Sequence, residues 1–125
     1  MGIKRVYVAG ILSPIGTNDP HPAVDYLLNV NHFIRASLDV LFAGFSPFCA
    51  ALDFQYFLAL RPGEHITEAT VKQIGFDWLE VCDAVLLTPG WEKSKGALAE
   101  IAHAEKHGIP VFKTLGDLKE AGRET

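Results

Sequence analysis

Residues 83–112, DAVLLTPGWEKSKGALAEIAHAEKHGIPVF, decide the fold of this 125-residue chain. Ala84–Leu87 and Ile109–Phe112 are short apolar runs without polar alternation, which is typical of parallel strands covered on both faces. Between them the sequence predicts a helix from about Ala97 to Lys106, which Gly108 ends. A strand, a helix and a second strand in this order form a βαβ unit, and its crossover is right-handed in nearly all proteins.

The segments outside this unit continue the alternation of strands and helices. Strands are predicted at Lys4–Gly10 and Phe45–Ala50, and Pro47 favours an edge position for the second. Helices are predicted at 23–43, 67–82 and 115–121. The predicted fold class is therefore α/β: a single domain over residues 1–125, with an open parallel sheet of four to five strands flanked by helices, Rossmann/flavodoxin-like.

Both long helices carry apolar side chains at helical spacing, which predicts the face that each turns to the sheet. The first is predicted to bury a stripe made of Val24, Leu27, Ile34, Leu38 and Leu41. The second is predicted to bury a stripe made of Val71, Ile74, Trp78 and Val81.

Composition narrows the classes of partner. The chain is 49% hydrophobic and carries a net charge of -4, so it has no basic surface for a nucleic-acid polymer or an anionic membrane. A single nucleotide stays compatible, because a loop and a helix N-terminus bind one phosphate through backbone N–H groups. Cys49 and Cys82 lie in apolar segments and no secretory leader is recognisable, which favours a reducing cytoplasm. No apolar run approaches the length of a membrane span.

Ligands of open parallel sheets bind beyond the carboxyl ends of the strands. The loops Ile11–Pro22 and Thr88–Gly96 both follow strands and are expected at that edge. Glu100 follows in the predicted first turn of the next helix, between the apolar residues Leu98 and Ile101. A carboxylate in this position is as compatible with a catalytic role as with stabilisation of the helix dipole.

Two further polar groups follow predicted strands. Ser94 and Gly96 precede a helix, where free N–H groups favour an anion, although Ser and Gly are also ordinary capping residues. Asp53 follows the Phe45–Ala50 strand and is interpreted as the N-cap of a short helix or as a contact for a sugar hydroxyl.

Glu100, His103 and His107 share one predicted helical face, and the two histidines have the i, i+4 spacing of zinc ligands. A solvated face with histidines near the helix C-terminus is the favoured interpretation. No metal and no cofactor are therefore predicted.

Three segments together resemble the nucleoside 2-deoxyribosyltransferase superfamily. The most specific is Cys82–Gly96, CDAVLLTPGWEKSKG, followed by Glu100. Tyr7–Gly10, YVAG, is similar to the opening strand and glycine of that superfamily, and Ala43–Phe48, AGFSPF, is similar to the entry of its second strand. The likeness is greatest to a small branch related to nucleoside 5′-monophosphate N-glycosidases.

The resemblance implies an activity and assigns roles by position. Members of the superfamily cleave or transfer the N-glycosidic bond of 2-deoxynucleosides or their monophosphates. Glu100 matches the nucleophilic glutamate, Ser94 and Gly96 match positions that bind the 5′-phosphate, and Tyr7 and Gly10 match the edge that receives the substrate. The implied partners are a small nucleoside or nucleotide and further copies of the chain, since sites of this superfamily are commonly completed across a homo-oligomer interface.

The sequence departs from this superfamily at one position. An aspartate usually stands eight residues before the position of Asp83, and Gly75 stands there instead. Asp77 lies about 200° round the helix from Gly75, so it would need a local distortion to act as the second catalytic carboxylate. Asp53 is the alternative second carboxylate. A third hypothesis is a domain that binds or senses nucleotides without cleaving them.

Overall fold

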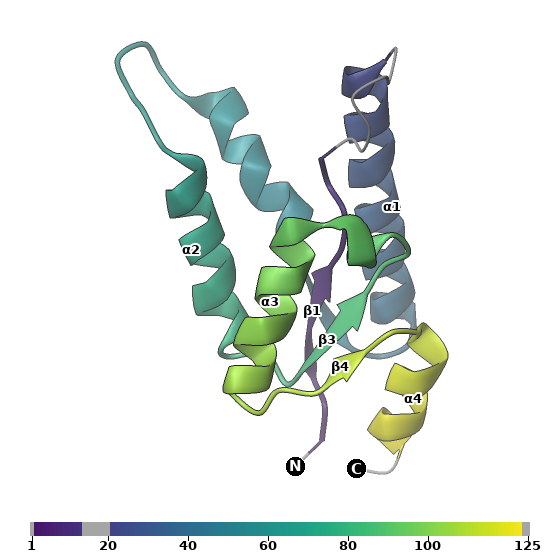
Figure 1. Ribbon diagram of the computed structural model, residues 1–125. Helices are drawn as coiled ribbons and strands as arrows, with labels where there is room; N and C mark the ends of the chain where they lie inside the picture. Colours follow the sequence, from purple (N-terminus) through teal and green to yellow (C-terminus); the bar gives the residue numbers. More distant parts are fainter. Residues whose placement is uncertain (1, 14–20, 124–125) are drawn as a thin grey trace.

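The computed structural model describes residues 2–13 and 21–123, so residues 14–20 of the predicted Ile11–Pro22 loop lie outside the described part. Four strands and four α-helices alternate along the chain (Figure 1). The strands are β1 (Arg5–Ala9), β2 (Ser46–Cys49), β3 (Ala84–Leu87) and β4 (Val111–Phe112). The helices are α1 (Pro22–Phe42), α2 (Glu68–Leu79), α3 (Lys95–Lys106) and α4 (Leu115–Arg123), with 3-10 helices η1 (Ala50–Ala59) and η2 (Trp91–Lys93).

The strands form one parallel sheet in the order β2-β1-β3-β4. This is the predicted α/β fold with a Rossmann/flavodoxin-like arrangement, and it has four strands. β2 lies at one edge of the sheet, as Pro47 indicated, and β4 lies at the other. The order reverses between β1 and β3, which makes the carboxyl ends of these two strands the expected place for a ligand. Asp83 fixes their register, because its Oδ2 accepts hydrogen bonds of 2.9 Å from the backbone N–H groups of both Lys4 and Arg5.

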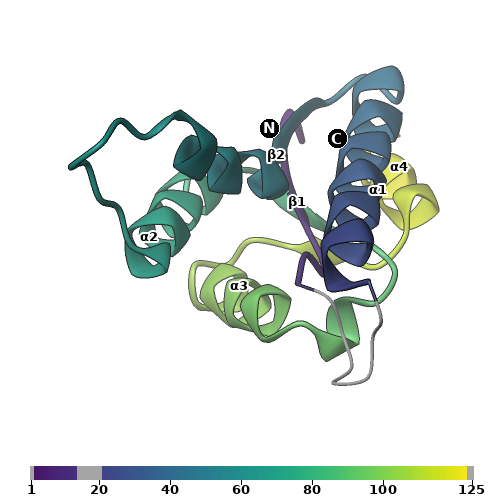
Figure 2. The same ribbon diagram turned by 90° about the horizontal axis from the view of Figure 1, so that it is seen from above.

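Helices cover both faces of the sheet (Figure 2). On one face Val6, Val8 and Leu86 pack with residues of α1 and α4 such as Val40 and Leu118. On the other face the alternate residues of the same strands pack with α2 and α3, and this group comprises Tyr7, Ala9, Leu79, Cys82, Val85, Leu87 and Ala104. The two cores explain why β3 is apolar at every position and why β1 is buried from Val6 to Ala9, whereas Arg5 at the start of β1 is exposed.

The predicted buried stripe of α1 is wrong. The residues that α1 buries are Val30, Phe33, Ser37 and Val40, and each of the last three precedes a predicted residue by one position. The predicted residues are exposed instead, from Ile34 at 36% to Leu27 at 65%. The cause is that α1 is apolar around more than half of its circumference, so its periodicity fits two neighbouring faces.

The face of α2 is displaced in the same way. Val71 is buried as predicted, but Gly75 and Leu79 complete the buried face, while Trp78 and Val81 are about half exposed. Thr67 caps the helix by accepting a hydrogen bond from the N–H of Thr70, at 3.1 Å. Helix α2 therefore packs on the sheet through the face that carries Gly75.

α3 begins earlier than predicted. Ser94 is its N-cap and accepts a hydrogen bond of 3.1 Å from the N–H of Ala97, so the helix starts at Lys95. Glu100 consequently lies in the second turn and not in the first. Among the helices of residues 2–13 and 21–123, none combines the length and the apolarity that a membrane crossing needs.

Candidate functional site

Tyr7 and Glu100 form the polar centre of the face that α2 and α3 cover. Tyr7 lies in the middle of β1 and is 1% exposed, and its hydroxyl donates a short hydrogen bond to Oε2 of Glu100 on α3. The ring of Tyr7 stacks on Phe48 of β2 with centroids 5.3 Å apart, which fixes its direction. The strand pairing places these two rings, because Tyr7 stands opposite Phe48 in the register. The Tyr7 side chain, whose ring is fixed by stacking, thus holds the Glu100 carboxyl against the sheet.

Burial changes the proton affinity of both groups. Burial, together with the charge of Asp53, raises the pKa of Glu100 from 4.5 to about 7, although the Tyr7 hydrogen bond acts in the opposite direction. Burial and then the negative charge of Glu100 raise the pKa of Tyr7 well above its ordinary value. Tyr7 therefore stays protonated as a donor, while Glu100 exchanges its proton near neutral pH. A carboxyl group with this property fits an acid, base or nucleophile that works at neutral pH.

Asp53 is the second carboxylate near this centre. It lies in the first turn of η1, directly after the carboxyl end of β2, and Cys49 occupies the N-cap position. The N-cap interpretation of Asp53 is therefore wrong. Its charge raises the pKa of both Glu100 and Tyr7, which places it within electrostatic range of the pair. Burial raises its own pKa.

Gly75 lies against the hydroxyl of Tyr7. A Cβ atom at Gly75 would stand 2.8 Å from the Tyr7 oxygen, so the phenol occupies the space that a side chain there would need. The position where the resemblance expects an aspartate is thus beside the Tyr7–Glu100 pair, and in this chain it carries no functional group. The resemblance identifies this position in the sequence, but nothing in the sequence indicates that the Tyr7 hydroxyl lies against it.

Asp77 lies apart from this group. Its side chain is exposed, and its Oδ1 accepts a hydrogen bond of 2.9 Å from Nε2 of Gln73 on the outer side of α2. The helix is regular over this turn, so the distortion that would bring Asp77 to Glu100 is absent. The carboxylate that the fold brings to Glu100 is Asp53.

Gly10 and Ser94 join the ends of β1 and α3 at the carboxyl edge. The Ser94 hydroxyl donates a hydrogen bond of 3.4 Å to the carbonyl oxygen of Gly10. A Cβ atom at Gly10 would lie 1.7 Å from Oγ1 of Thr88, so only glycine fits at this position. Gly96 is exposed in the first turn of α3 and has ordinary space around it. Of the predicted phosphate residues, Gly96 therefore lies about 6 Å and Ser94 about 9 Å along the helix axis from Glu100.

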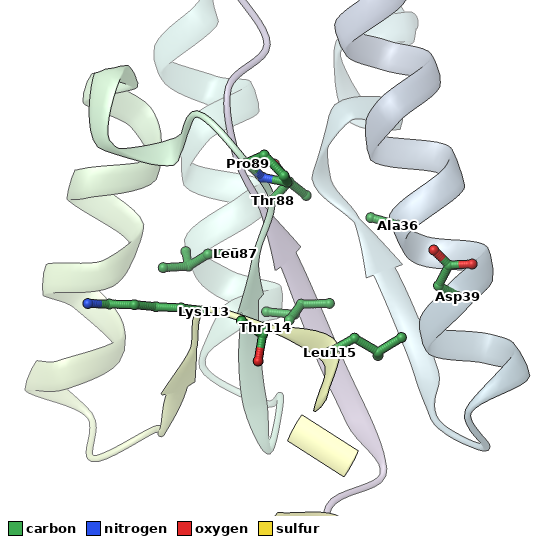
Figure 3. A pocket seen from close by; sticks show the side chains of 9 residues that line it. Ala36, Asp39, Leu87, Thr88, Pro89, Lys113, Thr114 and Leu115 are labelled. Atoms are coloured by element: carbon green, nitrogen blue, oxygen red, sulfur yellow. The ribbon is translucent and has the colours of Figure 1, made fainter. Parts of the chain in front are cut away.

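Two cavities in the described part of the chain are lined by residues other than Tyr7 and Glu100. The larger, of about 290 Å³, lies beyond the carboxyl ends of β3 and β4 on the face of α1 and α4 (Figure 3). Thr88, Pro89 and Lys113 line it together with Asp39. The second, of about 220 Å³, is a groove between α1, β2 and η1.

The chain matches a known family. Residues 4–113 match a family described as Domain of unknown function (DUF4406). This range contains every strand of the sheet and the whole Tyr7–Glu100 site. A comparison with curated proteins gives no match.

Proposed function

Because the chain belongs to the DUF4406 family, whose function is unknown, its activity has to be argued from its site, and we propose that it cleaves or transfers the N-glycosidic bond of a 2-deoxynucleoside or its 5′-monophosphate. The observation that carries this proposal is the Glu100 carboxyl, which is held by Tyr7 on the inner face of the sheet with a pKa of about 7. The resemblance to the nucleoside 2-deoxyribosyltransferase superfamily supports it at the same residues.

Glu100 acts as the nucleophile. One carboxylate oxygen bonds to C1′ while the bond from C1′ to the base breaks, and the base leaves with the electron pair of that bond. Water or a second base then attacks C1′ from the vacated side and releases Glu100, so the configuration at C1′ is retained. Tyr7 holds the carboxylate in line for the attack. The pKa of about 7 means that the ionised, nucleophilic form of Glu100 gains population as the pH rises through neutrality.

Asp53 supplies the proton that the departing base takes. Its pKa is raised by burial, so it holds a proton more readily than an exposed aspartate does. This role replaces the one that the resemblance would give to an aspartate at Gly75. The 5′-phosphate of a nucleotide substrate is placed at the N-terminus of α3, where backbone N–H groups at Gly96 and the cap at Ser94 favour an anion.

The working form is a homo-oligomer, and its contact surface is the α1/η1 patch. The patch consists of large apolar side chains that are at least one-third exposed: Val24, Leu27, Leu28, Ile34, Leu38, Leu41 and Phe42 on α1, and Leu52, Tyr56, Phe57 and Leu58 on η1. Large apolar side chains of this kind make up the core of protein–protein interfaces, which bury about 800 Å² per partner.

The patch continues to the site. Leu52, which lines the groove against Ile34 and Leu38, is the residue before Asp53. A second copy seated on this surface would therefore stand close to Asp53. Leu38→Glu and Leu41→Glu are expected to give monomers in analytical ultracentrifugation, and dimers that survive both substitutions would exclude this surface. The cytoplasm is the proposed compartment, since the thiols Cys49 and Cys82 are both free.

The activity is tested by chromatography. A panel of 2-deoxynucleosides and 5′-monophosphates is incubated with and without an acceptor base, and released or exchanged base is measured. Glu100→Ala is expected to abolish turnover, and Glu105→Gln, an exposed carboxylate on the same helix, is the matched control. Unchanged turnover in Glu100→Ala would exclude the proposal.

The second candidate is a domain that binds nucleotides without cleaving them, and the missing side chain at Gly75 favours it. It predicts a rise in melting temperature with a nucleotide and no released base. A Glu100-dependent release of base from any compound of the panel would exclude this second candidate.

A further inference from the structure

The histidines of α3 form a cluster with a residue that the sequence did not connect to them. Nε2 of His103 lies 2.9 Å and Nε2 of His107 lies 3.2 Å from Oε1 of Glu80. All three potential ligand atoms lie within 4.8 Å of one another. Glu80 is the C-cap residue of α2, so the cluster joins two different helices. Glu100, which shares the helical face with these histidines in sequence, turns instead to Tyr7.

The spacing of these atoms fits the coordination of zinc. Zinc binds imidazole nitrogen and carboxylate oxygen at about 2.0–2.2 Å, and tetrahedral geometry then places two ligand atoms about 3.3 Å apart. The separations of 2.9 and 3.2 Å between nitrogen and oxygen are within a few tenths of an ångström of that value. Two histidines one helical turn apart and one carboxylate from a neighbouring element leave the fourth position to water.

The surroundings hold the ligands in place. The ring of His103 packs on Phe76 of α2 with centroids 4.6 Å apart. The ring of His107 contacts the His103 ring edge-on, with centroids 4.5 Å apart. The imidazole directions are therefore set by packing before any ion binds, which lowers the entropy lost on binding.

The charge of the surroundings favours a cation. Glu80 and His107 are the C-cap residues of α2 and α3, so the C-termini of both helices converge on the cluster. Each helix C-terminus carries a partial negative charge. The Glu80 carboxylate and these two helix ends favour a cation, and Lys106 in the last turn of α3 is the opposing positive charge on that helix end.

We propose that Glu80, His103 and His107 bind one Zn²⁺ ion, which fastens the C-terminal end of α2 to that of α3. Two neutral imidazoles and one carboxylate select Zn²⁺ over Mg²⁺ and Ca²⁺, which take oxygen ligands. The role is structural, because the side chains of the cluster face the outside of the α2–α3 pair and Glu100 faces the sheet. The ion stabilises the position of Gly75 on α2 relative to Glu100 on α3.

The test uses protein purified without a histidine tag. Zn²⁺ titration by calorimetry is expected to saturate at one ion per chain, and Co²⁺ is expected to give the visible absorption of a tetrahedral site. The melting temperature is expected to rise with Zn²⁺ and not with Mg²⁺. Loss of a ligating group is expected to weaken zinc binding more than about a hundredfold, since outer partners of ligands alone account for 10–100-fold.

The variants Glu80→Gln, His103→Gln and His107→Gln keep hydrogen-bonding groups at partly or largely exposed positions, so they are expected to fold. The matched control is His32→Gln, an exposed histidine on α1. Circular dichroism shows that each variant is folded before it is titrated. Zinc binding of equal strength in Glu80→Gln and His103→Gln, equal loss in His32→Gln, or no saturable binding by the unaltered protein would overturn the proposal. None of these readouts depends on glycosidic activity.

Discussion

Glu100→Gln separates what this residue contributes to stability from what it contributes to chemistry. Burial raises the pKa of Glu100 from 4.5 to about 7, so the folded protein holds this proton more tightly than the unfolded chain does. Below pH 4.5 the Glu100 carboxyl is protonated in both the folded and the unfolded state, and its contribution to the free energy of unfolding is fully present. Between pH 4.5 and about 7 the unfolded chain has lost the proton while the folded protein still holds it, so the free energy of unfolding falls as the pH rises.

The magnitude follows from the difference between the two pKa values. A tenfold change in proton affinity corresponds to about 1.4 kcal/mol, so the rise from 4.5 to about 7 amounts to about 3 kcal/mol. Glutamine stays neutral and its amide oxygen still accepts the hydrogen bond of Tyr7. We therefore expect Glu100→Gln to match the unaltered protein near pH 4.5 and to exceed its free energy of unfolding by about 3 kcal/mol at pH 8.5. For a domain of this size the gain in melting temperature is about 10 °C.

Urea unfolding followed by circular dichroism at pH 4.5, 5.5, 6.5, 7.5 and 8.5 measures this difference directly. The comparison between two variants cancels the titration of all other groups that they share. Glu105→Gln is the control, because Glu105 is exposed on the same helix and its difference from the unaltered protein is expected to stay constant. A difference for Glu100→Gln that does not change with pH would refute the assignment of a raised pKa, and with it the main argument for the site.

Three further predictions test the packing around this centre. Tyr7→Phe removes the hydrogen bond that lowers the pKa of Glu100, so the acid limb of the rate profile is expected to move above pH 7; an unmoved limb would show that the hydroxyl does not act on the carboxylate. Gly75→Ala places a methyl group 2.8 Å from the Tyr7 oxygen and is expected to lower the free energy of unfolding by about 1–2 kcal/mol in chemical denaturation. In the Tyr7→Phe background the hydroxyl is gone, so the same substitution is expected to raise the free energy of unfolding by up to about 1 kcal/mol, because alanine favours the helix more than glycine does. Additive effects in that double-mutant cycle would rule out the contact. Gly10→Ala overlaps Oγ1 of Thr88 and is expected to lower the melting temperature by more than about 8 °C, and Thr88→Ala in the same chain is expected to restore part of the loss.

The βαβ unit could be predicted because its signals are local. Ala84–Leu87 is an apolar run of strand length, and the structure forms a strand over the same four residues. Gly108 follows the end of the next helix as predicted, whereas the cap at Ser94 starts that helix two residues before the predicted Ala97. Glu100 lies on the helix that follows β3, so these local signals were sufficient to predict that it lies beside the sheet.

The faces of the helices could not be predicted, because periodicity gives the angle between side chains but not the direction of the sheet. On α1 the stripe with Leu27 and Leu38 is as regular as the stripe with Phe33 and Val40. Only packing against the sheet selects the second. The first is left outside, where the proposed oligomer would cover it.

Contacts between residues that are far apart in the sequence could not be predicted either. Nothing in the spacing of His103 and His107 points to Glu80, which reaches them only because α2 and α3 lie side by side. The partner of Glu100 is similarly 93 positions away, at Tyr7. Asp53 could be proposed from its place after a strand, but its approach to Glu100 depends on η1, whose 3-10 geometry the sequence did not indicate.

The two ends of the described chain have a practical consequence for how the molecule is handled. β1 begins at Arg5 and α4 ends at Arg123 on the same side of the molecule, away from the carboxyl edge of the sheet (Figure 1). Any tether, fluorophore or fusion partner joined near these residues leaves the carboxyl edge of the sheet at Ser94 uncovered. The same side also holds the last turns of α2 and α3, so a histidine tag there would compete with His107 for the proposed zinc ion. A biotin anchor would immobilise the protein without adding metal ligands.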